Sequence, residues 1–149
     1  MTHGRDDAGD GLDGLCDPVR EWFEGAFPGG PTPAQWPAIG SGEHVLLISP
    51  TGTGKTLAGF LAIVDRLMRE HAGDGLKPGL RCVYVSPLRS LGYDVEKNLA
   101  VPLRGLQRLL GLGKCPIRVG VRTGDTTAHE RRKLREGPPH ILITTPESL

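Results

Sequence analysis

The sequence predicts an α/β protein with a doubly wound parallel sheet that carries helices on both faces. After residue 40, short apolar runs alternate with amphipathic segments of helical periodicity. These runs lack in–out alternation, which is typical of strands buried on both faces of a parallel sheet. A glycine-rich loop, SPTGTGKT at 49–56, lies between the first apolar run and a helical segment. A chain of 149 residues has room for one such domain.

The N-terminal segment differs in composition from the rest. Its first seventeen residues carry five Asp and one Arg, without the basic start and apolar stretch of a secretory signal. We expect residues 1–16 to be a disordered acidic leader and residues 17–149 to be the folded domain. The domain is expected to begin with an amphipathic helix over 17–27, whose apolar side carries Val19, Trp22, Phe23 and Phe27.

The remaining elements follow along the chain in alternation. Strands are expected at 44–49, 81–86, 117–121 and 140–145. Helices are expected from 55 to about 70, from about 88 to 110 with a break near Pro102, and at 127–136.

Composition and charge bound the function. The apolar runs are too short to span a bilayer, so we expect a cytoplasmic protein with no membrane partner. Three widely spaced cysteines, without a CxxC pair, argue against a disulfide framework or a structural zinc site. Residues 99–136 carry nine Lys or Arg and three Asp or Glu, a net of +6. This basic stretch is either a solvated face or a surface for an anionic polymer.

The loop at 49–56 fits the Walker A template, with Ser49 in place of the first glycine. Glycines allow the backbone amides of such a loop to converge on phosphate oxygens. Lys55 is expected to reach the β- and γ-phosphates, and the Thr56 hydroxyl to hold Mg²⁺. The expected ligands are therefore Mg²⁺ and a nucleoside triphosphate, bound by Thr51, Gly52, Thr53, Gly54, Lys55 and Thr56.

Several classes of protein carry this loop. The Asn-Lys-x-Asp sequence with which GTPases read guanine is absent, whereas a small P-loop kinase remains an alternative. Four further motifs bear on the choice: PTPAQ at 31–35, SPLRSLGYDVEKNL at 86–99, RTGDT at 122–126 and TTPESL at 144–149.

In this order the motifs resemble the Q motif, motif Ia, the glycine-containing element and motif Ib of superfamily 2 DEAD/DEAH-box helicases. The resemblance covers residues 17–149 and is nearest to the large helicase-related (Lhr) family. It implies a RecA-like sheet and ATP hydrolysis coupled to 3′→5′ translocation on single-stranded nucleic acid, with DNA favoured over RNA. It also implies that Lys55 assists phosphate stabilisation and that Gln35 contacts adenine. The nucleic-acid-binding residues it implies are Pro87, Leu88, Arg89, Gly124, Thr145, Pro146 and Glu147.

The chain also departs from the family pattern. No apolar run closes on Asp-Glu, the carboxylate pair that holds Mg²⁺ and positions water in such ATPases, so no catalytic set is complete. We therefore expect an incomplete domain that hydrolyses little ATP alone, with a downstream region or a partner chain supplying the rest of the motor. The stretch after Gln35 is about one helical turn shorter than in the family, which bears on adenine recognition. A non-catalytic binding module and an unfolded remnant remain alternatives.

Overall fold

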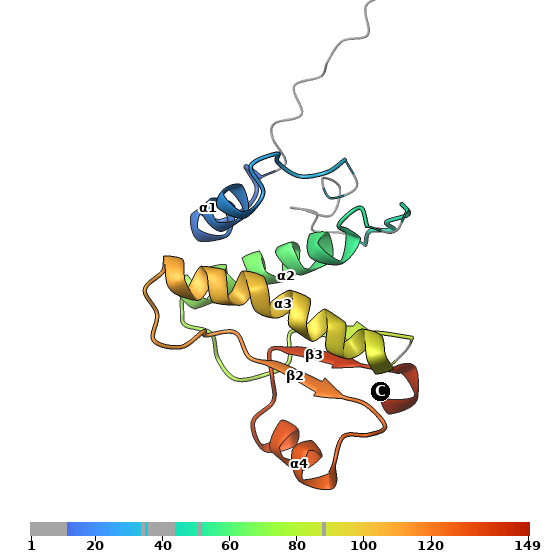
Figure 1. Ribbon diagram of the computed structural model, residues 1–149. Coiled ribbons are helices and arrows are strands. Elements are labelled where there is room, and N and C mark those ends of the chain that lie inside the picture. Colours follow the sequence, from blue (N-terminus) through green and yellow to red (C-terminus); the bar gives the residue numbers. More distant parts are fainter. Residues whose placement is uncertain (1–11, 34, 36–43, 51, 88) are drawn as a thin grey trace, which may run out of the picture. The chain divides into compact units, whose positions relative to one another are not determined.

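The computed structural model describes residues 12–33, 35, 44–50, 52–87 and 89–149 of the chain (Figure 1). The chain separates into two compact units, Met1–Arg66 and Leu67–Leu149. The expected leader falls largely outside the described residues. None of the helices in the described ranges is both long and apolar enough to cross a membrane.

In the first unit, helix α1 (Asp17–Ala26) confirms the expected N-terminal helix. Val19 and Phe23 are buried, and Phe23 packs its ring against Phe27 with centroids 5.0 Å apart. Helix α2 (Lys55–Ala72) contributes its first twelve residues to this unit. Its Asp65 accepts a hydrogen bond of 2.5 Å from the backbone N–H of Cys16, the N-cap of α1. A carboxylate at this end of α1 also complements the helix dipole.

The second unit contains a parallel sheet of three strands, β1 (Cys82–Val85), β2 (Val119–Arg122) and β3 (Ile141–Thr144). The strand order is β1-β3-β2, so β3 is central. Cys82 and Val119 both pair with Ile141, and Val85 and Arg122 both pair with Thr144. The three strands therefore end together at one edge of the sheet, and the predicted α/β parallel architecture is confirmed.

Helices lie on opposite sides of this sheet (Figure 1). Helix α3 (Arg89–Leu109) covers the face on which Ile141 and Ile143 are fully buried. Helix α4 (Ala128–Glu136) approaches the other face so closely that a Cβ on Gly120 would lie 2.6 Å from a methyl of Leu134. Among the described residues, this close contact of α4 lies on the β2 side of that face.

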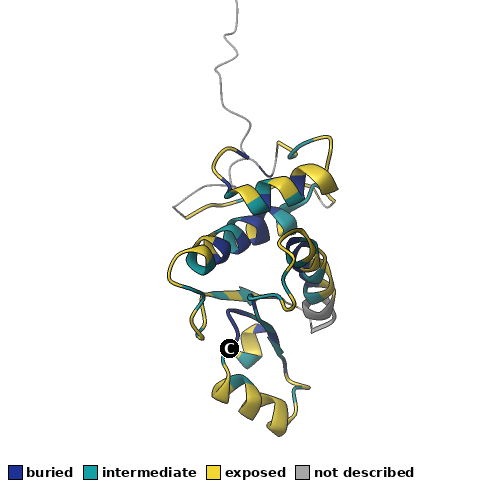
Figure 2. Ribbon diagram, turned by 90° about the vertical axis from the view of Figure 1, so that its left-hand side faces the viewer, coloured by how far each residue is buried: buried dark blue, intermediate teal, exposed yellow. Residues whose placement is uncertain are grey.

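The burial colouring of Figure 2 distinguishes the covered sheet from the exposed surface of α4. Val83 and Val85 of β1 are 41% and 45% exposed, although the sequence predicted strands covered on both faces. Leu142, which pairs with Val83, is half-buried. The apolar surface of β1 therefore remains partly accessible in the described chain.

The strand expected at 44–49 is a wrong prediction. Residues 44–50 carry no strand, and Val45, Leu46 and Ile48 are 44%, 85% and 83% exposed. A strand buried in a parallel sheet needs hydrogen-bonding neighbours along its edges. No strand of the described residues pairs with this segment, so its apolar side chains face outward.

The break expected near Pro102 is also wrong, because α3 continues through this residue as a single helix of 21 residues. Proline removes one backbone hydrogen bond from a helix interior. Leu99, Leu103 and Leu106 are buried on both sides of Pro102, and this apolar anchoring holds the helix together across the lost bond.

Candidate functional site

The phosphate loop leads directly into α2, which begins at Lys55 as predicted. Gly52 and Gly54 both have φ of +82°, a conformation that L side chains rarely adopt. The hydroxyl of Thr53 donates to the carbonyl of Pro50 at 2.9 Å and lies 2.6 Å from the Ser49 hydroxyl. The loop therefore closes on itself through its own side chains. Thr51 lies outside the described residues.

The side chain of Lys55 folds back over this loop. Its Nζ donates to the carbonyl oxygens of Ser49 and Pro50, both at 2.5 Å. The positive N-terminal end of the α2 dipole and the ammonium group of Lys55 therefore both lie at the phosphate loop. The next residue, Thr56, is exposed in the first turn of α2.

Gln35 lies against the same loop. Its side chain is 4% exposed, accepts from the Thr32 N–H at 2.8 Å and donates to the Gly54 carbonyl at 3.3 Å. The Thr32 hydroxyl donates to the Thr53 carbonyl at 2.9 Å. The turn around 31–35 is thus joined to the phosphate loop, and the structure brings the predicted Gln35 and loop residues together. Its contact with adenine stays a prediction.

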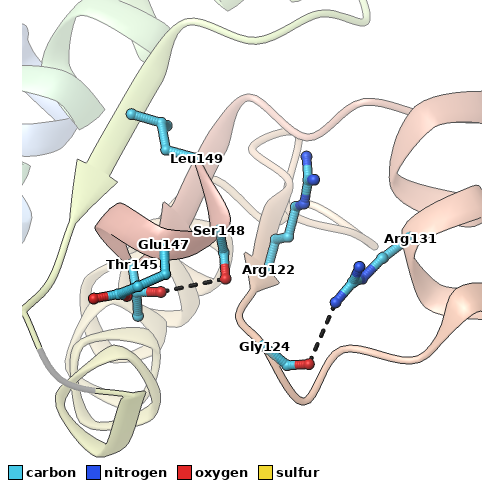
Figure 3. Close-up of a pocket in the computed structure, with 7 residues that line it drawn as sticks. All are labelled: Arg122, Gly124, Arg131, Thr145, Glu147, Ser148 and Leu149. Carbon is cyan, nitrogen blue, oxygen red and sulfur yellow. Dashed lines mark hydrogen bonds between the residues drawn. The ribbon is translucent and has the colours of Figure 1, made fainter.

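A second site lies at the edge where β2 and β3 end. A pocket of about 240 Å³ opens there between the loop after β2 and the short 3-10 helix Pro146–Ser148 (Figure 3). Its lining combines residues from the third and fourth of the resembling motifs with one residue of α4. They are Arg122, Gly124, Arg131, Thr145, Glu147, Ser148 and Leu149.

Three of these residues, Gly124, Thr145 and Glu147, were predicted from the sequence. Thr145 is buried and its hydroxyl donates to the Ser148 hydroxyl at 3.3 Å, whereas Glu147 is exposed. Pro146 is also exposed and starts the 3-10 helix.

Two arginines of the pocket were missed. Arg122 closes β2, and the sequence signal for it was its place at the start of RTGDT, directly after the apolar run. The sequence did not distinguish Arg131 from the other charged residues of α4. These residues together favoured a solvent-exposed face for the helix. Its guanidinium donates to the carbonyls of Thr126 at 3.0 Å and Gly124 at 3.3 Å. The pocket thus presents two guanidinium groups beside the side-chain carboxylate of Glu147.

The structure describes only some of the residues that were predicted to bind nucleic acid after β1. Ser86 is buried and its N–H donates to the Thr144 carbonyl at 2.8 Å, which aligns the end of β1 with that of β3. Pro87 follows and is exposed. Leu88 and the side chain of Arg89 lie outside the described residues, so their contacts with a strand stay predictions.

The described ranges hold no cluster of three His, Cys, Asp or Glu side chains that could bind a metal ion. Mg²⁺ bound with a nucleotide needs no such cluster, because it takes most ligands from phosphates and water. The exposed Thr56 hydroxyl beside the phosphate loop fits the role of a protein ligand to such an ion.

Comparison with known proteins places these motifs in one family. Residues 32–149 match the model of the DEAD/DEAH box helicases. The chain is 48% identical over 140 residues to the Lhr helicase/uracil glycosylase of Escherichia coli (strain K12), a match that covers 88% of this chain and 9% of that protein. It is 49% identical over 141 residues to the ATP-dependent helicase Lhr-Core protein 2 of Thermococcus barophilus (strain DSM 11836 / MP), covering 91% and 16%.

The solved structure of Mycobacterium smegmatis helicase Lhr bound to ssDNA and AMP-PNP resembles this chain with a TM-score of 0.81 and 48% identity. The match covers 94% of this chain and 18% of that one. The chain therefore spans less than a fifth of the length of each of these three proteins. The resemblance to Lhr-like helicases drawn from the motifs, and the RecA-like fold it implied, are confirmed.

Proposed function

The chain belongs to the DEAD/DEAH box helicase family, and on this premise we propose that it is the ATP-binding and strand-binding portion of an Lhr-like helicase motor. The single observation that carries the proposal is that one chain contains two sites of different chemistry. One is a closed Walker A loop at the start of α2, and the other is a basic pocket at the carboxyl ends of β2 and β3.

The nucleotide half of the proposal assigns ATP to the loop at 49–56. The backbone amides around Gly52 and Gly54 would receive the phosphates, and Lys55 would exchange its bonds to Ser49 and Pro50 for phosphate oxygens. Thr56 would hold Mg²⁺, which neutralises phosphate charge when it is bound. Support comes from the Mycobacterium smegmatis relative, whose structure was solved bound to ssDNA and AMP-PNP.

The strand half of the proposal assigns single-stranded nucleic acid, DNA in preference to RNA, to the strand-end edge of the sheet. Arg122 and Arg131 supply charge for backbone phosphates, and the hydroxyls of Thr145 and Ser148 supply hydrogen bonds. Such contacts hold the backbone without reading bases, which suits a translocating motor. We infer 3′→5′ translocation in the cytoplasm for the complete motor.

Hydrolysis is assigned to the complete motor rather than to these 149 residues alone. Their sequence has no apolar run that closes on Asp-Glu, so the chain lacks the carboxylates that hold Mg²⁺ and position water. The same observation favours one alternative, a non-catalytic module that binds nucleotide or nucleic acid. A detectable ATPase rate on adding the remainder of an Lhr-like motor would exclude that alternative.

The deciding experiment is calorimetric titration of the purified chain with Mg-ATP, beside a Lys55→Ala variant. We expect wild type to bind in the micromolar to low-millimolar range, and the variant to lose at least about tenfold in affinity, because charge-assisted hydrogen bonds to phosphate are removed. Circular dichroism of both proteins controls for folding. A folded wild-type chain that binds no Mg-ATP would contradict the nucleotide half of the proposal.

A further inference from the structure

Arg131 belongs to α4 by sequence but to the strand-end pocket by its contacts. Its Nε donates to the Thr126 carbonyl at 3.0 Å. One terminal nitrogen donates to the Gly124 carbonyl at 3.3 Å, and Figure 3 shows this second bond. Two donors of one planar group are therefore directed at two carbonyls of the loop that joins β2 to α4. These two hydrogen bonds, called the Arg131 clamp below, hold the loop against the first turn of α4.

The same loop is closed from its other side. The N–H of Thr123 donates to the Thr126 hydroxyl at 2.8 Å, and the N–H of Thr126 returns a bond of 3.2 Å to the Thr123 carbonyl. Thr127 then caps α4 in a capping box with Glu130, whose pKa is lowered by its hydrogen bonds from the Thr127 backbone and hydroxyl. Arg131 thus holds the outer carbonyls of a turn that is already fixed at both ends.

The position of this turn sets one wall of the pocket. Gly124 lies on that wall, next to Arg122 at the end of β2, and Thr145 faces them from the end of β3. We propose that Arg131 is a positioning residue for strand binding, which holds the 123–126 turn at the spacing from Thr145 that a nucleic-acid backbone requires. The inference rests on the proposed function, because that function supplies the strand.

Arginine and lysine differ in the property that matters here. Both carry the positive charge, but only the guanidinium presents several donors in a fixed plane. An ammonium at position 131 would keep the charge at the pocket and lose the paired bonds to Gly124 and Thr126. Arg131→Lys therefore separates positioning of the turn from simple attraction of phosphate.

The test measures binding of a fluorescent oligothymidylate to the 149-residue chain over a series of salt concentrations. We expect Arg131→Lys to bind about fivefold to tenfold more weakly, with an unchanged salt dependence because the charge is kept. Arg131→Ala is expected to bind at least as weakly, and the slope of log K against log salt should become shallower by about 0.7. Wild-type affinity in Arg131→Lys would overturn the positioning role.

The matched control is Arg132→Ala on the same helix. Arg132 is 62% exposed and contacts Glu136 at 3.6 Å, outside the pocket. The Arg132→Ala substitution removes an identical charge. We expect this variant to bind the oligothymidylate within about twofold of wild type, because exposed ion pairs contribute little. Thermal unfolding of each variant verifies that all are folded.

A readout without nucleic acid distinguishes failure of this inference from failure of the proposed function. In ¹H–¹⁵N spectra, Arg131→Lys should shift the amides of Asp125 and Thr127, whose nitrogens share a peptide group with the two accepting carbonyls, and leave that of Tyr84 in β1 unchanged. If wild type bound no oligonucleotide, the strand half of the proposed function would fail. Unchanged amides at Asp125 and Thr127 would separately overturn the role of the Arg131 clamp.

Discussion

At the residue scale, the phosphate loop is held by its neighbours as well as by its glycines. A Cβ on Gly54 would fall 2.3 Å from the side-chain nitrogen of Gln35. Position 54 therefore requires glycine for two reasons. Its φ is positive, and a side chain there would occupy the space of the Gln35 amide. Through this contact, the Gln35 side chain packs directly against the phosphate loop at Gly54.

His140 is a second residue whose surroundings decide its chemistry. It is 2% exposed, and its Nδ1 accepts the backbone N–H of Arg118 at 2.9 Å. Burial lowers its pKa most, and the charge of Arg118 lowers it further. A hydrogen bond with the Lys77 backbone raises the pKa in part, and the weaker effects of Arg81 and Glu70 lower and raise it respectively. The imidazole is therefore neutral in the folded protein at pH values where the unfolded chain has begun to take up a proton.

We predict that this difference makes the protein less stable in mild acid. Because the folded-state pKa of His140 lies below the ordinary value of 6.5, its contribution is fully present above pH 6.5 and is lost as the pH falls toward the folded value. The free energy of unfolding should decline by at most about 1.4 kcal/mol per pH unit from this group.

Urea unfolding between pH 5 and 8 checks the prediction, with His140→Asn as the comparison. The asparagine oxygen can accept the Arg118 N–H but does not titrate in this range. Its stability should therefore be flatter with pH than that of wild type. Parallel curves for the two proteins would show that the pH dependence has another origin.

At the element scale, α4 is placed by a close contact rather than by a large apolar face. It has no buried residue of its own, and its approach to β2 depends on the absence of a side chain at Gly120. The capping box of Thr127 and Glu130 fixes where it begins. This explains how a helix rich in charge still has a defined position beside the strand-end pocket.

We predict that Gly120→Ala destabilises the protein by about 1–3 kcal/mol, because the added methyl would lie 2.6 Å from Leu134 and 2.9 Å from Pro139. The matched control is Gly59→Ala in α2, where no atom lies within 4 Å of the added methyl. In a helix this change should be neutral or stabilising by up to about 1 kcal/mol. Urea midpoints measure both, and equal effects of the two substitutions would contradict the packing argument.

Local pattern predicted those elements whose partners lie within the described chain. Apolar runs and turn residues were enough for α1, α2, α4 and the three paired strands. The segment 44–49 has the same local pattern as β3, yet its burial depends on neighbouring strands, which the described chain does not provide. Pro102 was misjudged for a similar reason, since the buried leucines around it outweigh its local effect.

The candidate sites show the same limit. Motifs at the ends of β2 and β3 predicted Gly124 and Thr145, but the place of Arg131 depends on how α4 folds back onto the loop before it. Its neighbours Arg132 and Lys133 have the same charge and nothing in the local sequence separates the three. Only its contact with two loop carbonyls distinguishes Arg131 from the other two.

At the scale of the whole molecule, the apolar segment 44–49 is the main departure from a self-sufficient fold. Leu46 and Ile48 are more than 80% exposed and lie next to the phosphate loop. Exposed contiguous apolar residues favour association with another surface. Burying one such side chain contributes about 1.5–3 kcal/mol, so even partial burial of both would stabilise a dimer or larger assembly.

We therefore predict that the isolated chain self-associates through this segment, and that replacing Leu46 and Ile48 together by lysine suppresses the association. Charges on an exposed apolar extended segment oppose intermolecular pairing. Sedimentation velocity over a hundredfold range of protein concentration should show a rising mass for wild type and a constant monomer mass for the double variant. Val101→Lys in α3, where the valine is 65% exposed, controls for placing a lysine at an exposed apolar position elsewhere and should associate like wild type. If wild type stayed monomeric throughout this range, the exposed segment would not be an association surface, and its apolar character would have to serve contacts made only in the complete motor.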